Sequence, residues 1–185
     1  MIPLHDDNPT NIRPYVTWII IGLCVTVFLW QLSLDSNLAQ QAIYALGVVP
    51  AVIVGDKVLP PDVVLVPSIV TLITSMFMHG SWMHLIGNML FLWVFGNNIE
   101  DAMGHVKFAI FYLVTGFAAS AGQVLSNIDS EIPMIGASGA ISGVLGAYLI
   151  LYPRARVLVL IWLAFFVTTM RIPAIIVLAG WLILQ

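Results

Sequence analysis

Long apolar runs separated by short polar clusters dominate this chain. Each run is long enough for a helix that crosses a bilayer or a large part of one, since about 20 residues of helix span roughly 30 Å of hydrocarbon. We therefore expect a polytopic, all-α membrane bundle in which five spans begin. The expected spans cover residues 15–34, about 83–95, 108–125, 139–152 and 174–184.

The stretches between these runs are expected to be of three kinds. Residues 1–14 form a polar N-terminal leader, of which the first ten are expected to be disordered, and residues 15–185 form one membrane domain. Residues 35–81 are interrupted by prolines and are expected to lie in the membrane interface or on other helices, with a short re-entrant or interfacial helix near 69–78. The apolar piece 157–167 is too short for an upright span, so it is interfacial, re-entrant or strongly tilted.

Composition supports a membrane protein and excludes other classes. Of the 185 residues, 61% are hydrophobic and 8% are charged, with a mean hydropathy of +1.03. The net charge of −3 and the lack of a basic run argue against a nucleic-acid partner. Cys24 is the single cysteine, so no intramolecular disulfide forms. No metal or cofactor is indicated, and the lipid bilayer is the first expected partner.

The basic residues predict the orientation of the chain. With a cytoplasmic N-terminus, five of the six basic residues lie inside and only Lys57 lies outside, as the positive-inside rule requires. The second and fourth spans then both start at the outer face. Three polar residues, His84, Asn88 and Ser138, would consequently share one leaflet. The inner residues are Arg13, Lys107, Arg154, Arg156 and Arg171.

A run of small residues around Ser138 is the main candidate for chemistry. Gly136 and Gly139 flank this serine closely enough to leave its hydroxyl accessible. His84 and Asn88, at positions i and i+4, share one helix face. Taken singly, each feature has a plainer explanation: Ser138 as a packing residue in a glycine stripe, and the His–Asn pair as hydrogen bonds between helices.

The set His79-Gly-Ser-Trp-Met-His84-Leu-Ile-Gly-Asn88, followed by Gly96, Glu100, Gly104 and Gly136-Ala-Ser138-Gly139, resembles the rhomboid family of intramembrane serine proteases. The resemblance covers the chain from about residue 15 onward. It implies that Ser138 is the nucleophile and that His84 and Asn88 belong to the oxyanion hole. Gly136 and Gly139 become glycines of the site, and His79 becomes a residue that lines it.

Other positions depart from the family pattern. Rhomboids carry their general base, a histidine, on a sixth helix, which we expect beyond Gln185 in a whole protein of six or more spans; the chain is then truncated and inactive as it stands. Ser142 occupies a position where family members can carry an aromatic residue, and the first loop lacks a Trp-Arg pair that some members show.

Two functions follow from the resemblance. The first is an endopeptidase that cuts single-span membrane proteins near the outer surface, in a bacterial or archaeal cell membrane. The second is an inactive rhomboid-like protein that binds transmembrane clients without cutting them. A small transporter or channel would require further intramembrane charges or an inverted repeat, and the sequence shows neither.

Overall fold

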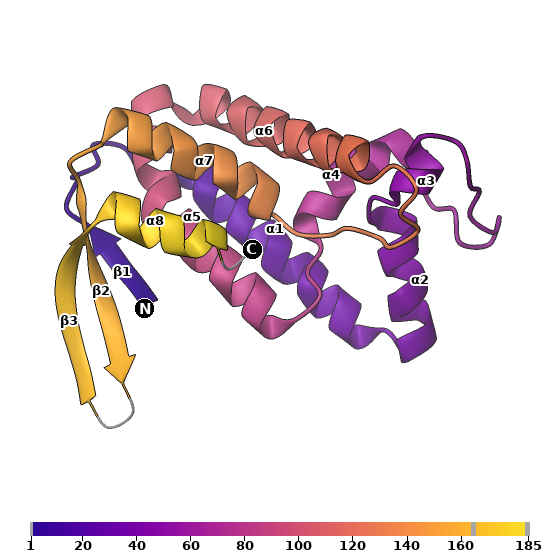
Figure 1. Ribbon diagram of the computed structural model, residues 1–185, viewed down its shortest axis with the longest axis horizontal. Coiled ribbons are helices and arrows are strands. Elements are labelled where there is room, and N and C mark those ends of the chain that lie inside the picture. Colours follow the sequence, from indigo (N-terminus) through magenta and orange to yellow (C-terminus); the bar gives the residue numbers. More distant parts are fainter. Residues whose placement is uncertain (1, 164–165, 184–185) are drawn as a thin grey trace.

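The computed structural model describes residues 2–163 and 166–183, most of which form helices that lie side by side (Figure 1). In chain order the elements are β1 (Ile2–Asp6), α1 (Tyr15–Ser33), α2 (Ser36–Leu46), α3 (Pro50–Ile53), η1 (Ser68–Val70), α4 (Thr71–Thr74), η2 (Ser75–Phe77), α5 (Trp82–Met103), α6 (His105–Ser126), α7 (Ser138–Leu151), β2 (Arg156–Leu163), β3 (Phe166–Pro173) and α8 (Ala174–Ile183), where η marks a 3-10 helix.

The predicted helical membrane bundle is confirmed. Among the described residues, α1 and α6 are long and apolar enough to cross a membrane. A third span is obtained if η1 to η2 and α5, which meet at a bend of 80°, count as one broken span. Helices α7 and α8 are shorter apolar helices. The predicted end of the fifth run, at residue 184, lies outside the described residues.

Glu100, near the end of α5, anchors the start of α1. The first backbone N–H groups of a helix have no partner within it. Here the Glu100 carboxylate accepts hydrogen bonds from the N–H groups of Val16 and Thr17, at 2.9 and 2.8 Å, and from Thr17 Oγ1 at 2.7 Å. His105 Nδ1 lies 2.6 Å from the same carboxylate, which is fully buried. The pairing holds α1 and α5 in a fixed relative position.

Small residues allow α6 and α7 to pack closely. A Cβ atom added to Gly143 would lie 2.5 Å from Thr115 Cβ, and one added to Gly139 would lie 2.7 Å from Ala119 Cβ. Real Cβ atoms do not approach that closely, so a larger side chain at either glycine would force the helices apart. The small-residue stripe predicted on the fourth span therefore is a helix contact.

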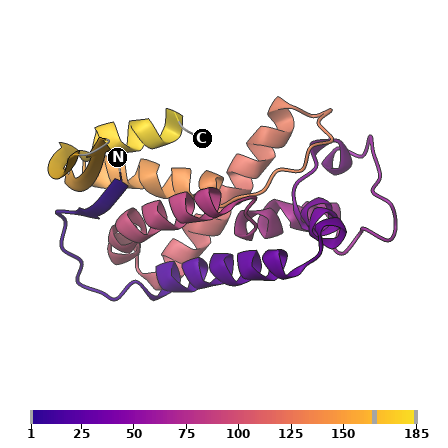
Figure 2. The same ribbon diagram turned by 90° about the horizontal axis from the view of Figure 1, so that it is seen from below.

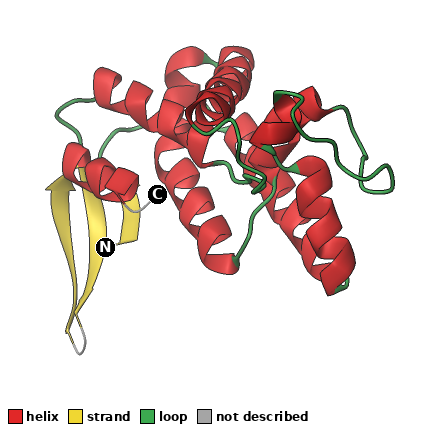
Figure 3. Ribbon diagram, turned by 45° about the vertical axis from the view of Figure 1, so that its right-hand side comes forward, coloured by secondary structure: helices red, strands yellow, loops and turns green. Residues whose placement is uncertain are grey.

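A three-stranded antiparallel sheet, ordered β1-β2-β3, lies at one end of the bundle, and the sequence did not predict it (Figure 3). Residues 2–6 pair with residues 157–160, so the expectation of a disordered start was wrong. The piece 157–167, of which residues 164 and 165 lie outside the described residues, belongs to β2 and to the start of β3 and is not an interfacial or tilted helix. Strand β1 satisfies its backbone groups through residues about 150 positions away, whereas β2 also pairs along its length with β3, the next element in the chain.

The proline-broken connection packs at the opposite end of the bundle from the sheet, with α2, α3 and α4 close together (Figure 1). Asp35 caps α2 by accepting a hydrogen bond from Leu38 N–H at 2.9 Å. Val48 and Met134 exchange two backbone hydrogen bonds, at 2.9 and 2.8 Å. The connection is thereby joined to the loop that leads into α7.

Candidate active site

The start of α5 presents His84 and Asn88 to the interior. Ser81 caps the helix by accepting a hydrogen bond from His84 N–H at 3.2 Å. The 80° bend before α5 fixes where this first turn begins. Asn88 is 1% exposed, so its amide lies where bulk water does not compete for its polar atoms, whereas His84 is half-buried.

Gly136 brings the loop before α7 against these two side chains. Its φ angle of 131° lies in a region that favours glycine. Its N–H donates to the Ser75 carbonyl at 2.9 Å. A Cβ atom added to Gly136 would lie 2.7 Å from His84 Cε1 and Nε2 and 3.9 Å from Asn88 Nδ2. Only a glycine therefore permits the loop to pass this close to the pair.

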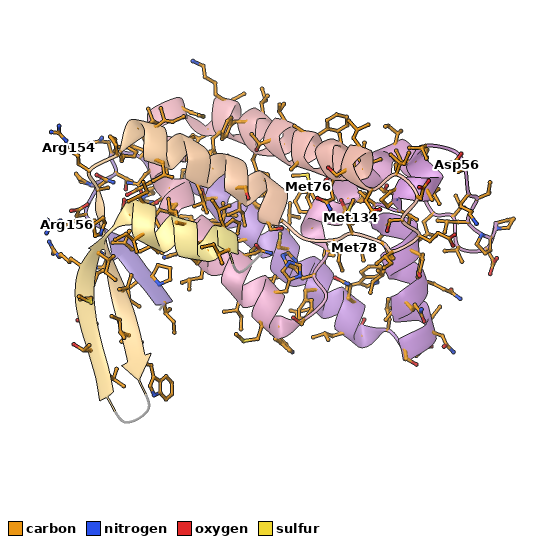
Figure 4. All side chains as sticks on the ribbon, viewed as in Figure 1. Asp56, Met76, Met78, Met134, Arg154 and Arg156 are labelled. Atoms are coloured by element: carbon orange, nitrogen blue, oxygen red, sulfur yellow. The ribbon has the colours of Figure 1, made fainter. Side chains whose placement is uncertain are left out.

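Ser138 is the first residue of α7 and lines a cavity of about 480 Å³. The N-terminus of a helix carries unpaired N–H groups and the positive end of the helix dipole, which both favour negative charge nearby. Ser138 is partly exposed. The cavity is lined by Val48, Ser75, Met76, Gly116, Ala119, Ser120, Gln123, Met134, Ile135, Gly136, Ser138, Gly139 and Ala140. Figure 4 shows Met76 and Met134 near the start of α7.

The Asn88 amide has hydrogen-bonding capacity that the described residues leave unused. Neither its Nδ2 nor its Oδ1 has a partner among them, although the side chain is buried. An unpaired buried amide is costly, so native proteins seldom keep one without a reason such as a water molecule or a ligand group. Because the Asn88 amide lies close to Gly136, it also lies near the start of α7.

His79 lies behind His84. Its ring is 1% exposed, packs edge-to-face on the His84 ring with centroids 5.1 Å apart, and has no hydrogen-bond partner for either nitrogen among the described residues. Gln31 of α1 holds the His79 backbone on both sides: its Oε1 accepts from His79 N–H at 3.2 Å and its Nε2 donates to the His79 carbonyl at 3.3 Å. Sequence reasoning missed Gln31, although a glutamine near the end of an apolar span was a visible signal.

The structure thus brings Gly136, His84, Asn88 and His79 together, with Ser138 two residues beyond Gly136. Gly139 also lines the cavity, while its missing side chain admits Ala119. The remaining two histidines lie elsewhere: His105 contacts Glu100 at the far end of α5, and His5 is in β1. Ser75, Ser120 and Gln123 line the cavity and were not predicted to belong to the site.

Comparison with known proteins gives the family. A model of the Rhomboid domain matches residues 67–185, which include every residue of the site except Gln31 and Val48. The chain belongs to the rhomboid family. It is an integral membrane protein, as the apolar helices and the family agree.

Several curated rhomboids are similar to this chain. Rhomboid protein 1, mitochondrial, of Saccharomyces cerevisiae is 31% identical over 170 residues, which are 85% of this chain and 43% of that protein. RHOMBOID-like protein 6, mitochondrial, of Arabidopsis thaliana is 37% identical over 79 residues, 42% of this chain and 25% of that protein. Rhomboid protease GluP of Bacillus subtilis is 40% identical over 78 residues, 42% of this chain and 15% of that protein.

The chain therefore spans less than half the length of these rhomboids. The expectation of a bacterial or archaeal cell membrane gains no support from them, since the relative that matches most of the chain is mitochondrial and eukaryotic.

Proposed function

We propose that this rhomboid is an intramembrane serine endopeptidase that cleaves single-span membrane proteins near the outer membrane surface, with Ser138 as its nucleophile. The observation that carries the proposal is the buried, unpaired Asn88 amide, which lies with the His84 ring against Gly136, two residues before Ser138. A preformed donor without a partner is what an oxyanion hole requires before substrate arrives.

In the proposed reaction, Ser138 Oγ attacks the carbonyl carbon of the scissile peptide bond and its proton passes to a general base. The carbonyl oxygen becomes an oxyanion, which accepts hydrogen bonds from Asn88 Nδ2, a His84 N–H and the Ser138 backbone N–H. Collapse of the tetrahedral intermediate expels the amine, which takes the proton, and leaves an acyl-enzyme that water then hydrolyses. The flanking Gly136 and Gly139 leave room for the substrate chain.

The general base is not assigned to a residue within the described part of the chain. His79 and His84 belong to α5 and the turn before it, and the proposal uses His84 as a donor. The alternative function, a rhomboid that binds transmembrane clients without cutting them, is favoured by a different observation: among the described residues, no histidine is hydrogen-bonded to Ser138 Oγ.

Labelling with a fluorophosphonate probe separates the two functions. The whole protein in bilayer nanodiscs should become labelled at Ser138, whereas its Ser138→Ala variant should not. Ser142→Ala is the matched control, since Ser142 lies one turn later and donates its hydroxyl to the Ser138 carbonyl at 2.8 Å; it should label like the parent. Equal labelling of the parent and Ser138→Ala, or no labelling of either, would overturn the nucleophile assignment.

A further inference from the structure

The β2–β3 hairpin projects away from the helices (Figure 1), at the end of the bundle opposite to α2 (Figure 2), and most of the described residues toward its tip are apolar. In the register of the sheet, Trp162 of β2 pairs with Val167 of β3 near the tip of the hairpin. Both side chains are exposed, at 70% and 59%. Nothing in the chemistry proposed for Ser138 uses this hairpin, which lies at the end of α7 opposite to that serine.

Alternation along the strands divides the sheet into two different faces. Residues directly opposite one another in neighbouring strands point to the same side. Val157 and Val159 are fully buried, so their face packs on the bundle. The other face, here called the outer face, carries Trp162 and Val167 near the turn. The rest of the outer face consists of Ile2, Leu160 and Thr169 in the middle and His5, Leu158 and Arg171 near the base.

Positive charge gathers at the base of the hairpin. Arg154 and Arg156 lie at this end of the bundle, and Arg171 joins them from β3 (Figure 4). Residues 156–173 contain no Asp or Glu. Two carboxylates lie nearby and are already engaged, since Asp6 accepts from the Tyr148 hydroxyl and Asp7 accepts from the Arg156 N–H. The outer face is therefore apolar toward the turn and basic toward the base.

We propose that this hairpin is a membrane-interface anchor, with its outer face lying on an anionic leaflet and Trp162 and Val167 inserted at the boundary between headgroups and acyl chains. Tryptophan is enriched at that boundary, and arginines beside an anionic surface attract its headgroups. Amphipathic elements with an apolar face and basic residues bind bilayers in this way.

The backbone of β3 limits how deeply the hairpin can enter. Within the described residues, β3 pairs with β2 alone, so its other edge has N–H and C=O groups that no strand satisfies. Such an edge does not persist in hydrocarbon, where water is absent. The interface supplies water to this edge while it accepts the apolar side chains. A second copy of the chain paired along β3 is the competing arrangement.

Spin-label accessibility in nanodiscs tests the anchor. The label is placed on Val167→Cys in a Cys24→Ala background, and Lys57→Cys serves as the control, since Lys57 is an exposed loop residue near the other end of the bundle. In phosphatidylcholine, the label at 167 should collide with oxygen several-fold more often, relative to a water-soluble nickel chelate, than the label at 57. Thr169→Cys, on the same face, replaces Val167→Cys if that variant does not fold.

The charge component is tested by adding phosphatidylglycerol to the nanodisc. The preference for oxygen at 167 should increase, and the double substitution Arg154→Gln with Arg171→Gln should remove that increase. Preferential contact with the nickel chelate at 167 would overturn the proposal, as would an absent response to phosphatidylglycerol. Protection from both reagents together with spin–spin broadening would instead show two copies paired along β3 and would equally overturn it.

Discussion

At the scale of single residues, the candidate site depends on a glycine whose missing side chain lets neighbouring groups come close. Gly136 is the decisive position, because its missing Cβ lets the loop lie against His84 and Asn88. Gln31 influences the position of His84 indirectly. Its amide pairs with the backbone of His79, and the His79 ring packs on the His84 ring. A donor aimed at an oxyanion is useful only if it is held in place before the reaction.

Replacing Asn88 with Ala should lower kcat by about 10²–10³-fold with little change in KM, because an oxyanion donor acts mainly in the transition state. Cleavage of a single-span model substrate in nanodiscs measures both constants. Asn97→Ala is the matched control: Asn97 lies farther along α5, and its side chain accepts a hydrogen bond from the next N–H. An equal loss in both variants would indicate a general effect on α5 and not a role in the oxyanion hole.

At the scale of helices and strands, contacts between α6 and α7 and between α1 and α5 hold the site in shape. The first contact depends on glycines that face Thr115 and Ala119, and the second depends on the buried Glu100 carboxylate. The two contacts are sensitive to different substitutions. Added side-chain volume disrupts the packing of α6 on α7, and loss of the carboxylate removes the hydrogen bonds between α1 and α5.

Gly143→Ala should destabilise the bundle by about 1–3 kcal/mol, because the added methyl group meets Thr115 and the well-packed contact has no space for it. Gly146→Ala is the control on the same helix: nothing lies within 4 Å of its added Cβ, and alanine is the better helix former. Unfolding in mixed micelles with increasing SDS compares the two. Similar unfolding midpoints for both variants would contradict the close contact.

Glu100→Ala should cost about 3 kcal/mol, since it leaves the N–H groups of Val16 and Thr17 without their charged acceptor in a buried setting. The same unfolding experiment applies. Glu131→Ala removes an exposed ion pair with Lys57 and should change stability by less than about 1 kcal/mol. If the two losses were alike, Glu100 would not anchor α1.

The starts of helices could be predicted from the sequence because burial in a bilayer imposes apolar runs, and the runs starting at Tyr15 and Ala174 begin helices in the structure. The end of α5 was predicted too early, near residue 95, because the helix continues through a polar stretch to Met103. His84 and Asn88 could be placed on one face from their spacing alone. The strand at Ile2 could not be predicted, because its partner lies about 150 residues away. The run at Val157 was interpreted from its length alone, and its pairing with the neighbouring residues 166–173 was missed. Gln31 could not be assigned either, since its role depends on where a bend places the His79 backbone.

At the scale of the whole molecule, the N-terminal segment joins the two ends of the chain. Strand β1 pairs with β2, and Asp6 accepts a hydrogen bond from the Tyr148 hydroxyl at 2.6 Å. Asn8 donates to that hydroxyl and to Asp6, and Asn98 of α5 donates to the Asn8 carbonyl. The first residues of the chain therefore contact α5, α7 and the sheet at the end away from Ser138.

This junction should make stability depend on pH. Burial raises the pKa of the Asp6 carboxyl above its ordinary value of 3.8, while the hydrogen bonds from Tyr148 and Asn8 oppose the rise. The folded state then holds the proton more tightly than the unfolded state. The contribution of Asp6 is accordingly full below pH 3.8 and is lost as the pH rises through the raised pKa.

Asp6→Asn should keep that contribution at every pH, so its advantage in unfolding temperature over the parent should grow as the pH rises through this window. Thermal unfolding in detergent across a pH series measures the difference. Asp56→Asn, in the exposed loop at the far end, should not reproduce this trend. A constant difference between Asp6→Asn and the parent would refute the proposed linkage.

The bridge between Val48 and Met134 has a consequence for how the sequence can vary. Gly47, next to this bridge, has room for no side chain, because an added Cβ would lie 2.5 Å from the Ile43 carbonyl oxygen and 2.9 Å from Ile135 Cγ2. Ile135 directly precedes Gly136. A smaller residue at 135 would relieve only the second of these contacts, because the first is with backbone, so related sequences that keep this bridge should keep glycine at 47. The proline-broken connection that contains Gly47 is thereby expected to vary little where it meets the loop that leads to Ser138.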